Sequence, residues 1–363
     1  MNVLSLFDGM SCGRIALERA GIEVDAYFAS EVDKHAIAVT TANWPQTIQL
    51  GDVRNVNPDV LGSIDLLIGG SPCQDFSFSG NMRGMATKCK EKITTLDRYL
   101  ELKEGGFEFT GQSYLFWEYV RAWHQIKARN PAAKFLLENV KMSKDNLAVL
   151  NKAMGCEPIL INSALLTAQN RRRYYWTNWP TTQPEDKGIV LADILEREVS
   201  EEYLISASYL NRLQTSTDLK KRFSAVDPEK AITMTARQYA NWKGNLVTAL
   251  TERRTEEAKA IRSANMKRGR DFSPRRGKEL AERSDGKMNC LTACYSMKEH
   301  SLFDGFEQYR KLTPIECERL QTVPDNYTAA ASNTQRYKML GNGWTVDVIA
   351  HLFRSIDNGQ TSD

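Results

Sequence analysis

The sequence predicts an α/β fold in which a largely parallel sheet carries helices on both faces. Short apolar runs alternate with helix-like segments through the N-terminal part of the chain, and this alternation is typical of βαβ units. Polar and acidic residues directly follow several of the apolar runs. Ligands of such sheets bind beyond the carboxyl ends of the strands, so these residues are the first candidates for a functional site.

The expected elements follow one another in a regular order. Strands are expected at 3–7, 24–29, 64–68 and 134–137, and helices at 14–20, 33–43, 193–199 and 346–355. Gly21 ends the first helix, and Asp33 is a suitable N-cap for the second. A further helix begins near Thr313 and Pro314, because threonine caps helices and proline suits their first turn.

Composition excludes several classes of protein. No apolar run approaches the ~18 residues of a membrane helix, and Met1 leads almost directly into the first strand without a basic leader, so no signal peptide is expected. The seven cysteines are odd in number and scattered, which favours free thiols in a reducing compartment. Cys290 and Cys294 lack further ligands at zinc spacing, so no metal is expected.

Positive charge is concentrated in one segment. The whole chain has a net charge of +3, whereas residues 251–287 hold 12 Lys and Arg against 7 Asp and Glu. Such a segment is typical of a nucleic-acid-binding surface. A solvated helical face without a ligand explains it equally well.

Candidate cofactor residues follow the 3–7 strand, the 24–29 strand and a third strand that ends before Gly51. They are Phe7, Asp8, Gly9, Met10, Glu31, Val32, Asp52 and Val53. A glycine-bearing turn lets the backbone approach a ligand, Glu31 can accept from ribose hydroxyls, and Asp52 can accept from an adenine amino group while Val53 packs on the ring. Each signal alone fits an ordinary turn or helix cap. Together, and without a Gly-x-Gly-x-x-Gly fingerprint, they predict an adenosyl cofactor without phosphates.

The sharpest signal is Gly-Gly-Ser-Pro-Cys-Gln at 69–74, directly after the 64–68 strand. Pro72 rigidifies the backbone before Cys73. A cysteine at the mouth of the sheet can act as a nucleophile once it becomes a thiolate. The alternative is a buried, inert thiol.

Two further motifs supply a carboxyl group and guanidinium groups. Glu138 follows the 134–137 strand and can hydrogen-bond or protonate a base ring, although a helix cap is the alternative. Strand alternation sends Arg171 and Arg173 to one face, where they suit a base carbonyl or a phosphate. The alternative for them is a basic edge strand that resists aggregation.

In this order, the motifs resemble those of the DNA cytosine-5 methyltransferase family, of bacterial or bacteriophage type. The resemblance spans residues 3–353 with one variable region, and the N-terminal motifs are also similar to those of the de novo cytosine methyltransferases. Near the C-terminus, residues 310–317 resemble the helix that supports the DNA-reading domain, and Gly341-Asn342-Gly343 resembles the cofactor loop that closes the catalytic domain.

The resemblance implies a Rossmann-like S-adenosylmethionine-dependent methyltransferase sheet with a smaller target-recognition domain. The expected division is 1–194 for catalysis and cofactor binding, 195–305 for target recognition and 306–363 for the return to the catalytic domain. It implies double-stranded DNA as partner, a monomer, no membrane, and a cytoplasmic protein at the nucleoid of a bacterial or phage-infected cell. Whether a restriction endonuclease accompanies it stays open.

The resemblance also implies the chemistry. The Cys73 thiolate attacks carbon 6 of a flipped-out cytosine, Glu138 holds ring N3 and the amino group, Arg173 contacts the base carbonyl and Arg171 organises the site. Carbon 5 then takes the methyl group, and a base that stays unassigned removes the carbon-5 proton. The cofactor pocket is completed by Pro72, Leu115, Asn342 and Trp344.

Two departures from the family pattern and three rival functions remain. The segment 77–114 is longer than in compact members, and the extra length forms either a surface excursion or a changed loop over DNA. In addition, Trp344 replaces a small residue. The rivals are a tRNA cytosine-5 methyltransferase, a catalytically silent DNA-binding regulator, and an oxidoreductase, which the missing glycine fingerprint disfavours. Phosphate contacts are expected from residues 267–270 and from Arg275 and Arg276.

Overall fold

The computed structural model describes residues 1–72, 93–109, 111–197, 199–205, 225–226, 228–236, 244–248, 251–254, 256–268, 278–281 and 309–356. The chain divides into two compact units. The first comprises Met1–Leu195, Glu229–Trp242 and Pro314–Asp363, and the second comprises Glu196–Pro228 and Lys243–Thr313.

This division differs from the expected one chiefly at Glu229–Trp242, which belongs to the first unit. Backbone hydrogen bonds explain the difference. The Ala231 amide donates to the Ala168 carbonyl at 2.7 Å, and the Asn170 amide donates to the Ala231 carbonyl at 2.8 Å. A short segment from the middle of the expected target-recognition region is thereby joined to the first unit.

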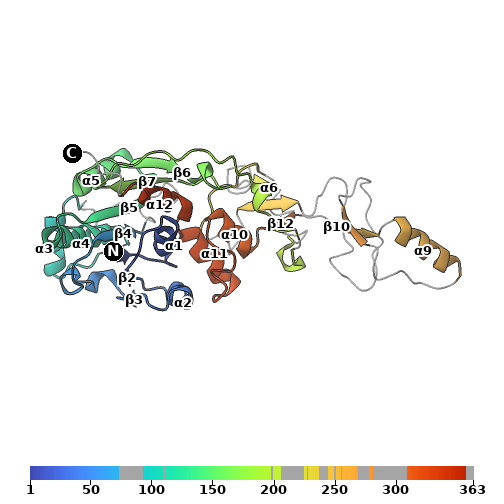
Figure 1. The fold of residues 1–363 in the computed structure, drawn as a ribbon, viewed down its shortest axis with the longest axis horizontal. Coiled ribbons are helices and arrows are strands. Elements are labelled where there is room, and N and C mark those ends of the chain that lie inside the picture. Colours follow the sequence, from blue (N-terminus) through green and yellow to red (C-terminus); the bar gives the residue numbers. More distant parts are fainter. Residues whose placement is uncertain are drawn as a thin grey trace. The chain divides into compact units, whose positions relative to one another are not determined.

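The first unit is built on a seven-stranded sheet of order β3-β2-β1-β4-β5-β7-β6 (Figure 1). Its strands are β1 (Asn2–Leu6), β2 (Ala26–Ser30), β3 (Ile48–Gln49), β4 (Leu66–Gly70), β5 (Lys134–Val140), β6 (Ile159–Asn162) and β7 (Arg172–Thr177). The strands from β3 to β5 pair in parallel, and β7 runs antiparallel to β5 and β6. The strand order reverses between β1 and β4, and ligands of such sheets bind at this switch point.

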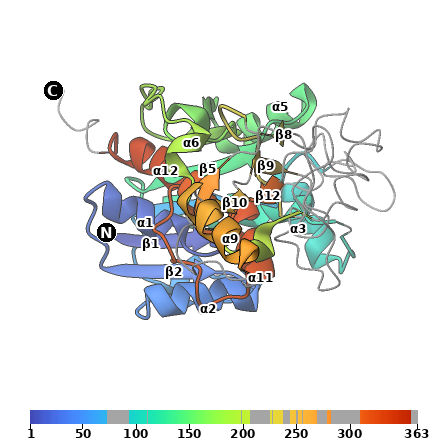
Figure 2. The same cartoon turned by 90° about the vertical axis from the view of Figure 1, so that its right-hand side faces the viewer.

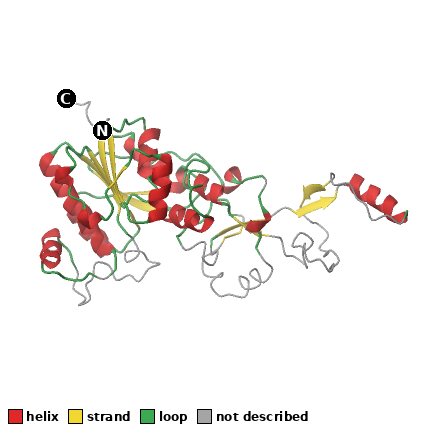
Figure 3. Cartoon of the chain, turned by 90° about the horizontal axis from the view of Figure 1, so that it is seen from below, coloured by secondary structure: helices red, strands yellow, loops and turns green. Residues whose placement is uncertain are grey.

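Helices cover both faces of this sheet (Figure 3). The helices of the first unit are α1 (Cys12–Arg19), α2 (Lys34–Asn43), α3 (Leu96–Glu104), α4 (Phe116–Arg129), α5 (Lys144–Met154), α6 (Leu191–Ile194), α10 (Pro314–Leu320), α11 (Asn333–Asn342) and α12 (Val346–Phe353). On one face α1 packs against α12 (Figure 2). The Asp33 side chain accepts from the His35 amide at 3.0 Å, so the predicted cap of α2 is confirmed. The predicted 193–199 helix was placed too late, because α6 ends at Ile194.

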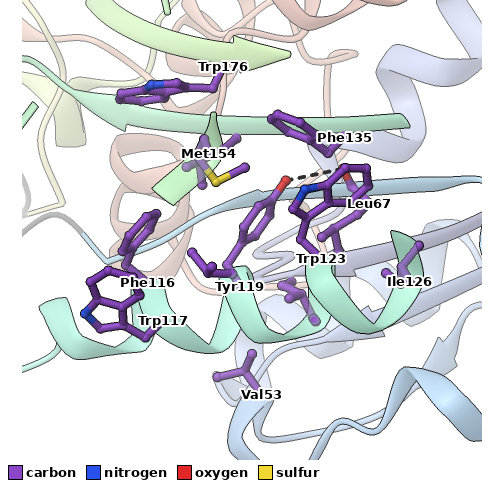
Figure 4. Packing of buried hydrophobic residues seen from close by; sticks show 14 of the residues in the cluster. Val53, Leu67, Phe116, Trp117, Tyr119, Trp123, Ile126, Phe135, Met154 and Trp176 are labelled. Atoms are coloured by element: carbon purple, nitrogen blue, oxygen red, sulfur yellow. Dashed lines mark hydrogen bonds between the residues drawn. The ribbon is translucent and has the colours of Figure 1, made fainter. Parts of the chain in front are cut away.

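The main hydrophobic core lies between α4 and the other face of the sheet (Figure 4). Trp123 of α4 packs against Phe135 of β5 with ring centroids 4.7 Å apart. The Tyr119 hydroxyl donates to the Leu136 carbonyl at 2.9 Å and contacts the Leu67 carbonyl at 3.4 Å. This helix therefore supports the two strands, β4 and β5, whose ends carry the candidate catalytic residues.

Part of the long 77–114 segment belongs to this core. Ile93 and Tyr99 are each 1% exposed, and the Tyr114 ring stacks with both Tyr99 and Phe109. Residues 93–109 are therefore anchored to the core through Ile93 and Tyr99, while their other side chains are half-buried or exposed. Residues 73–92 and Thr110 lie outside the described residues.

The second unit contains two small sheets. Its described elements are β8 (Ala225–Val226), β9 (Asn245–Thr248), β10 (Thr251–Arg254), α9 (Glu256–Lys267), β11 (Lys278–Ala281) and β12 (Tyr309–Lys311). One sheet has the order β12-β9-β8, and the other pairs β10 with β11. In the sequence, α9 lies between β10 and β11. The described helices of the chain include none with the length and hydrophobicity that a bilayer crossing requires.

Candidate functional site

The loop after β1 is tightly wound where the chain turns into α1. Phe7, Gly9 and Ser11 all have positive φ angles, of 58°, 59° and 62°. Residues other than glycine rarely adopt such angles. Asp8 lies at the centre, where its carboxylate accepts from the Tyr27 hydroxyl at 2.7 Å and from the Ser11 hydroxyl. Burial outweighs these hydrogen bonds and raises the pKa of Asp8 to about 6.

Glu31 joins the ends of β1 and β2. Its carboxylate accepts from the amides of Gly9, Val32 and Asp33, each at 2.8 Å. The neighbouring Val32 is 71% exposed, and a Cβ on Gly9 would meet nothing within 4 Å. An acceptor, an exposed apolar side chain and an open stretch of backbone thus lie together at the end of the sheet.

Asp52 and Val53 follow β3 as predicted, but their partners lie within the protein. Asp52 caps a short 3-10 helix, Val53–Asn55, by accepting from the Arg54 amide at 2.9 Å. The Arg54 guanidinium also donates to this carboxylate at 2.5 Å, and these hydrogen bonds lower the pKa of Asp52. Val53 is buried. Asp52 thus has partners within the protein, and its contact with an adenine amino group stays a prediction.

The ends of β4, β5 and β7 bring three of the predicted residues together. Glu138 pairs with Gly70 across β4 and β5, and it is a diagonal neighbour of Arg173 across β5 and β7. Diagonal neighbours share a face and lie within reach of long side chains. Arg173 Nε lies 2.9 Å from Glu138 Oε1, and Trp344 Nε1 donates to Glu138 Oε2 at 3.1 Å.

Arg171 occupies a different environment from Arg173. It precedes β7, is 3% exposed, and donates to the carbonyls of Met234, Gly341 and Gly343 at 3.2, 3.2 and 2.9 Å. Its guanidinium therefore holds the loop around Gly343 rather than presenting itself to a ligand. The predicted role of organising the site is compatible with these contacts, because the Gly343 loop also carries Trp344, which donates to Glu138.

The predicted nucleophile, Cys73, lies outside the described residues. The turn that leads to it is described as far as Pro72. The Asn139 side-chain amide donates to Ser71 Oγ at 3.0 Å, and both residues are buried. This hydrogen bond fastens the turn to β5 one residue beyond Glu138.

The remaining predicted cofactor residues have varied exposure. Leu115 packs at the edge of the main core, and Met10 is buried, with its carbonyl accepting from the Tyr327 hydroxyl at 2.8 Å. Asn342 is exposed at the end of α11. Trp344 points its indole N–H at Glu138.

Sequence reasoning missed two residues that shape the site. A Cβ on Gly70 would lie 2.9 Å from both Glu138 Oε2 and Trp344 Nε1, and the signal for this close approach was the Gly-Gly pair at a strand end. Gln321 donates to the Gly343 carbonyl at 3.1 Å and accepts from the Thr345 hydroxyl at 2.8 Å. No local pattern marks a glutamine at the end of a helix for that contact.

Comparison with known proteins places the chain in a family. The family model described as C-5 cytosine-specific DNA methylase matches residues 1–358. The Type II methyltransferase M1.ScrFI of Lactococcus lactis subsp. cremoris is 27% identical, over 96% of this chain and 75% of that protein. The orphan methyltransferase M.SPRI of Bacillus phage SPR is 25% identical, over 98% and 97% of the two chains.

Solved structures share the fold. The methyltransferase EhMeth of Entamoeba histolytica aligns with a TM-score of 0.64 at 15% identity, covering 100% of this chain and 99% of that one. A DNMT2 variant of Spodoptera frugiperda aligns with a TM-score of 0.60 at 19% identity, covering 98% and 99%. These likenesses confirm the Rossmann-like sheet that the sequence predicted.

Proposed function

This chain belongs to the family of C-5 cytosine-specific DNA methylases, and we propose that it transfers a methyl group from S-adenosylmethionine to carbon 5 of a flipped-out cytosine in a short duplex DNA sequence. The observation that carries the proposal is the Glu138 carboxylate, held by Arg173 at 2.9 Å and by Trp344 at 3.1 Å. It lies beside the turn that leads to Cys73, at the end of the sheet where ligands of this fold class bind.

The residues at the ends of β1 and β2 fit an adenosyl group. A carboxylate offers about four acceptor positions, and Glu31 uses three of them on backbone amides, which leaves one for a ribose hydroxyl. Val32 offers an exposed apolar surface. Phe7, Asp8, Gly9 and Met10 would border the group, with Asp52, Val53, Pro72, Leu115, Asn342 and Trp344 around it. When bound, S-adenosylmethionine supplies an electrophilic methyl group.

The proposed chemistry belongs to Cys73 and Glu138. The target base leaves the stack because its reacting carbon is inaccessible within a duplex. The Cys73 thiolate forms a bond to carbon 6, and Glu138 holds ring N3 and the amino group, so that carbon 5 becomes nucleophilic. After methylation, loss of the carbon-5 proton and breakage of the bond from sulfur to carbon 6 release the product. Arg173 contacts the base carbonyl, and Arg171 acts through the Gly343 loop.

We place DNA recognition in the second unit. Its β10 and α9 carry the positively charged segment, in which residues 251–287 have a surplus of five positive charges. Cationic side chains there would contact phosphates, and a few side chains would read base edges in the major groove. No cognate endonuclease forms part of this proposal, since one of the relatives is named an orphan methyltransferase.

The decisive experiment is methyl transfer from radiolabelled S-adenosylmethionine to unmethylated genomic DNA, with tRNA as a parallel substrate. Bisulfite sequencing of the DNA product then maps the modified cytosines. We expect label in DNA only, with protected cytosines confined to one short sequence context.

Two results would contradict the proposal. Label in tRNA alone would assign the chain to the RNA-modifying alternative. Absence of transfer to either substrate, with retained binding of S-adenosylmethionine and DNA, would identify a silent DNA-binding protein.

A further inference from the structure

We propose that Trp344 is a positioning residue that holds the Glu138 carboxylate from the cofactor side and so couples the cofactor loop to the base pocket. The inference rests on the proposed role of Glu138. The sequence predicts only that Trp344 completes the cofactor pocket, and the inference adds a second role. The contact that assigns the new role is the hydrogen bond from Trp344 Nε1 to Glu138 Oε2 at 3.1 Å.

The two oxygens of Glu138 have different partners. Oε1 faces Arg173 at 2.9 Å, from the neighbouring strand, while Oε2 accepts from Trp344, more than 200 residues away in the sequence. An ion pair to one oxygen leaves the carboxyl group free to rotate about its last bond. A second donor on the other oxygen fixes the plane of the group, and that plane decides whether both oxygens can address N3 and the amino group of one base.

Trp344 is itself held by its neighbours along the chain. The preceding carbonyl, of Gly343, accepts from Arg171 at 2.9 Å and from Gln321 at 3.1 Å. The following residue, Thr345, donates its hydroxyl to Gln321 at 2.8 Å. With the backbone fixed on both sides, the indole has little freedom, so the donor is already in place before a base arrives. Such preorganisation is what gives electrostatic contacts their catalytic value.

The other end of the indole faces the cofactor loop. A Cβ on Gly13 would lie 3.5 Å from Cζ3 of Trp344, so the ring lies over the start of α1, just after the Phe7–Met10 turn. A Cβ on Gly343 would lie 3.1 Å from the Met10 methyl group. The same Cβ would lie 3.4 Å from the Cys12 sulfur. The ring thus lies between the start of α1 and the Glu138 carboxylate, and these contacts are the route of the proposed coupling.

Gly70 provides the room for this contact. A side chain at that position would come within 2.9 Å of both hydrogen-bonding atoms, a distance that Cβ contacts essentially never show. The strand end is thus shaped for the pair of Trp344 and Glu138, and the need for glycine at position 70 is a second observation that supports the same contact.

A double-mutant cycle tests the inference, with Trp344→Phe and Glu138→Ala made singly and together in the full chain. Phenylalanine keeps an aromatic ring and removes the N–H donor. We expect Trp344→Phe to lower kcat about tenfold, as loss of a hydrogen bond to a charged group does, and to change the KM for S-adenosylmethionine less than threefold. In the Glu138→Ala background the same substitution should change the rate less than twofold. Single-turnover assays at high enzyme concentration keep the slow variants measurable.

Trp179→Phe is the matched control, because it removes an indole N–H that donates to the Leu352 carbonyl at 3.0 Å in the buried interior. It should change the melting temperature and leave kcat within twofold. If the effects of Trp344→Phe and Glu138→Ala multiply, or if Trp344→Phe raises only the KM for S-adenosylmethionine, the inference is overturned. Full activity of Glu138→Ala would instead overturn the proposed role of Glu138. This result differs from the results that would overturn only the role of Trp344.

Discussion

The Asp8 carboxylate shows how one partly buried charge ties stability to pH. Its pKa rises from 3.8 to about 6, chiefly because burial disfavours the charged form. The folded state therefore binds a proton more tightly than the unfolded state, and stability is lost as pH rises between about 4 and about 6. Each pKa unit corresponds to 1.36 kcal/mol, so the loss amounts to about 3 kcal/mol.

We expect Asp8→Asn to remove most of this pH dependence, because the amide keeps the shape of the group and cannot ionise. Urea unfolding of the two proteins at pH 4.5 and pH 7 measures it. The difference in the free energy of unfolding, parent minus variant, should be larger at pH 4.5 than at pH 7. An equal difference at both pH values would show that Asp8 titrates normally.

Cys73 is the residue on which the covalent chemistry depends. Cys73→Ala should abolish methyl transfer while S-adenosylmethionine binding stays within about threefold, because the cofactor residues at the strand ends are unchanged. Duplex DNA with 5-fluorocytosine at the target should trap a denaturation-stable adduct, since fluorine cannot leave as a proton does. Peptide mapping identifies the cysteine, and an adduct on any other cysteine would refute the assignment.

Gly70 matters because it has no side chain. Gly70→Ala places a methyl group 2.9 Å from Glu138 Oε2 and Trp344 Nε1, so one of the two must move. We expect kcat to fall at least tenfold, because catalytic geometry tolerates displacements of only a fraction of an ångström. Steady-state kinetics and a thermal melt together check this. Normal kcat in a folded variant would show that the pair can rearrange without cost.

Among the elements, α3 and α4 are joined by a buried carboxylate. Glu118 of α4 is fully buried and accepts from the Tyr99 hydroxyl at 2.6 Å, from Lys103 at 2.5 Å and from Arg121 at 2.7 Å. Arg121 also donates to the Val56 carbonyl at 2.8 Å. Since a buried charge is tolerated only when its lone pairs are satisfied, α3 stabilises the loop that follows β3 through Glu118 and Arg121.

Tyr99→Phe tests this link with the smallest change. Loss of the hydroxyl leaves Glu118 one donor short, so the free energy of unfolding should fall by about 1–3 kcal/mol. Glu101→Gln on the exposed side of the same helix, where Glu101 pairs with Arg98 at 3.1 Å, is the control and should change it by less than about 0.5 kcal/mol. Chemical denaturation gives both values, and equal effects would remove the special role of Glu118.

For the whole molecule, the unequal distribution of charge predicts how DNA binding responds to salt. Lys267 and Arg268 at the end of α9 are exposed, and each phosphate contact contributes about −0.9 to the slope of log K against log salt. We expect their double alanine variant to bind all duplexes more weakly and to flatten that slope by about 2. Fluorescence anisotropy between 50 and 200 mM salt measures it. An unchanged slope would place phosphate contacts elsewhere, with Arg270, Arg275 and Arg276, outside the described residues, as the next candidates.

The sequence by itself determined the α/β class, the approximate positions of β1, β2, β4 and β5, and the placement of Glu31 and Glu138 near the carboxyl ends of β2 and β5. It could do so because apolar periodicity and polar residues at strand ends are local properties, which can be recognised without knowing the tertiary contacts. Its errors also have local causes. The 193–199 helix was placed too late, because α6 ends at Ile194, and the burial of Ile93 and Tyr99 against α4 was not predicted.

Only the tertiary structure decided which side chains hold one another. The hydrogen bond between Trp344 and Glu138, the clamp of Arg171 and Gln321 on Gly343, and the room left by Gly70 join residues that are far apart in the chain. Such contacts depend on the register of β4, β5 and β7 and on the path of a distant loop, and neither leaves a periodic trace in the sequence. Strand-end chemistry is thus a local property of the chain, whereas the orientation of the Glu138 carboxylate arises only when four separate segments pack together.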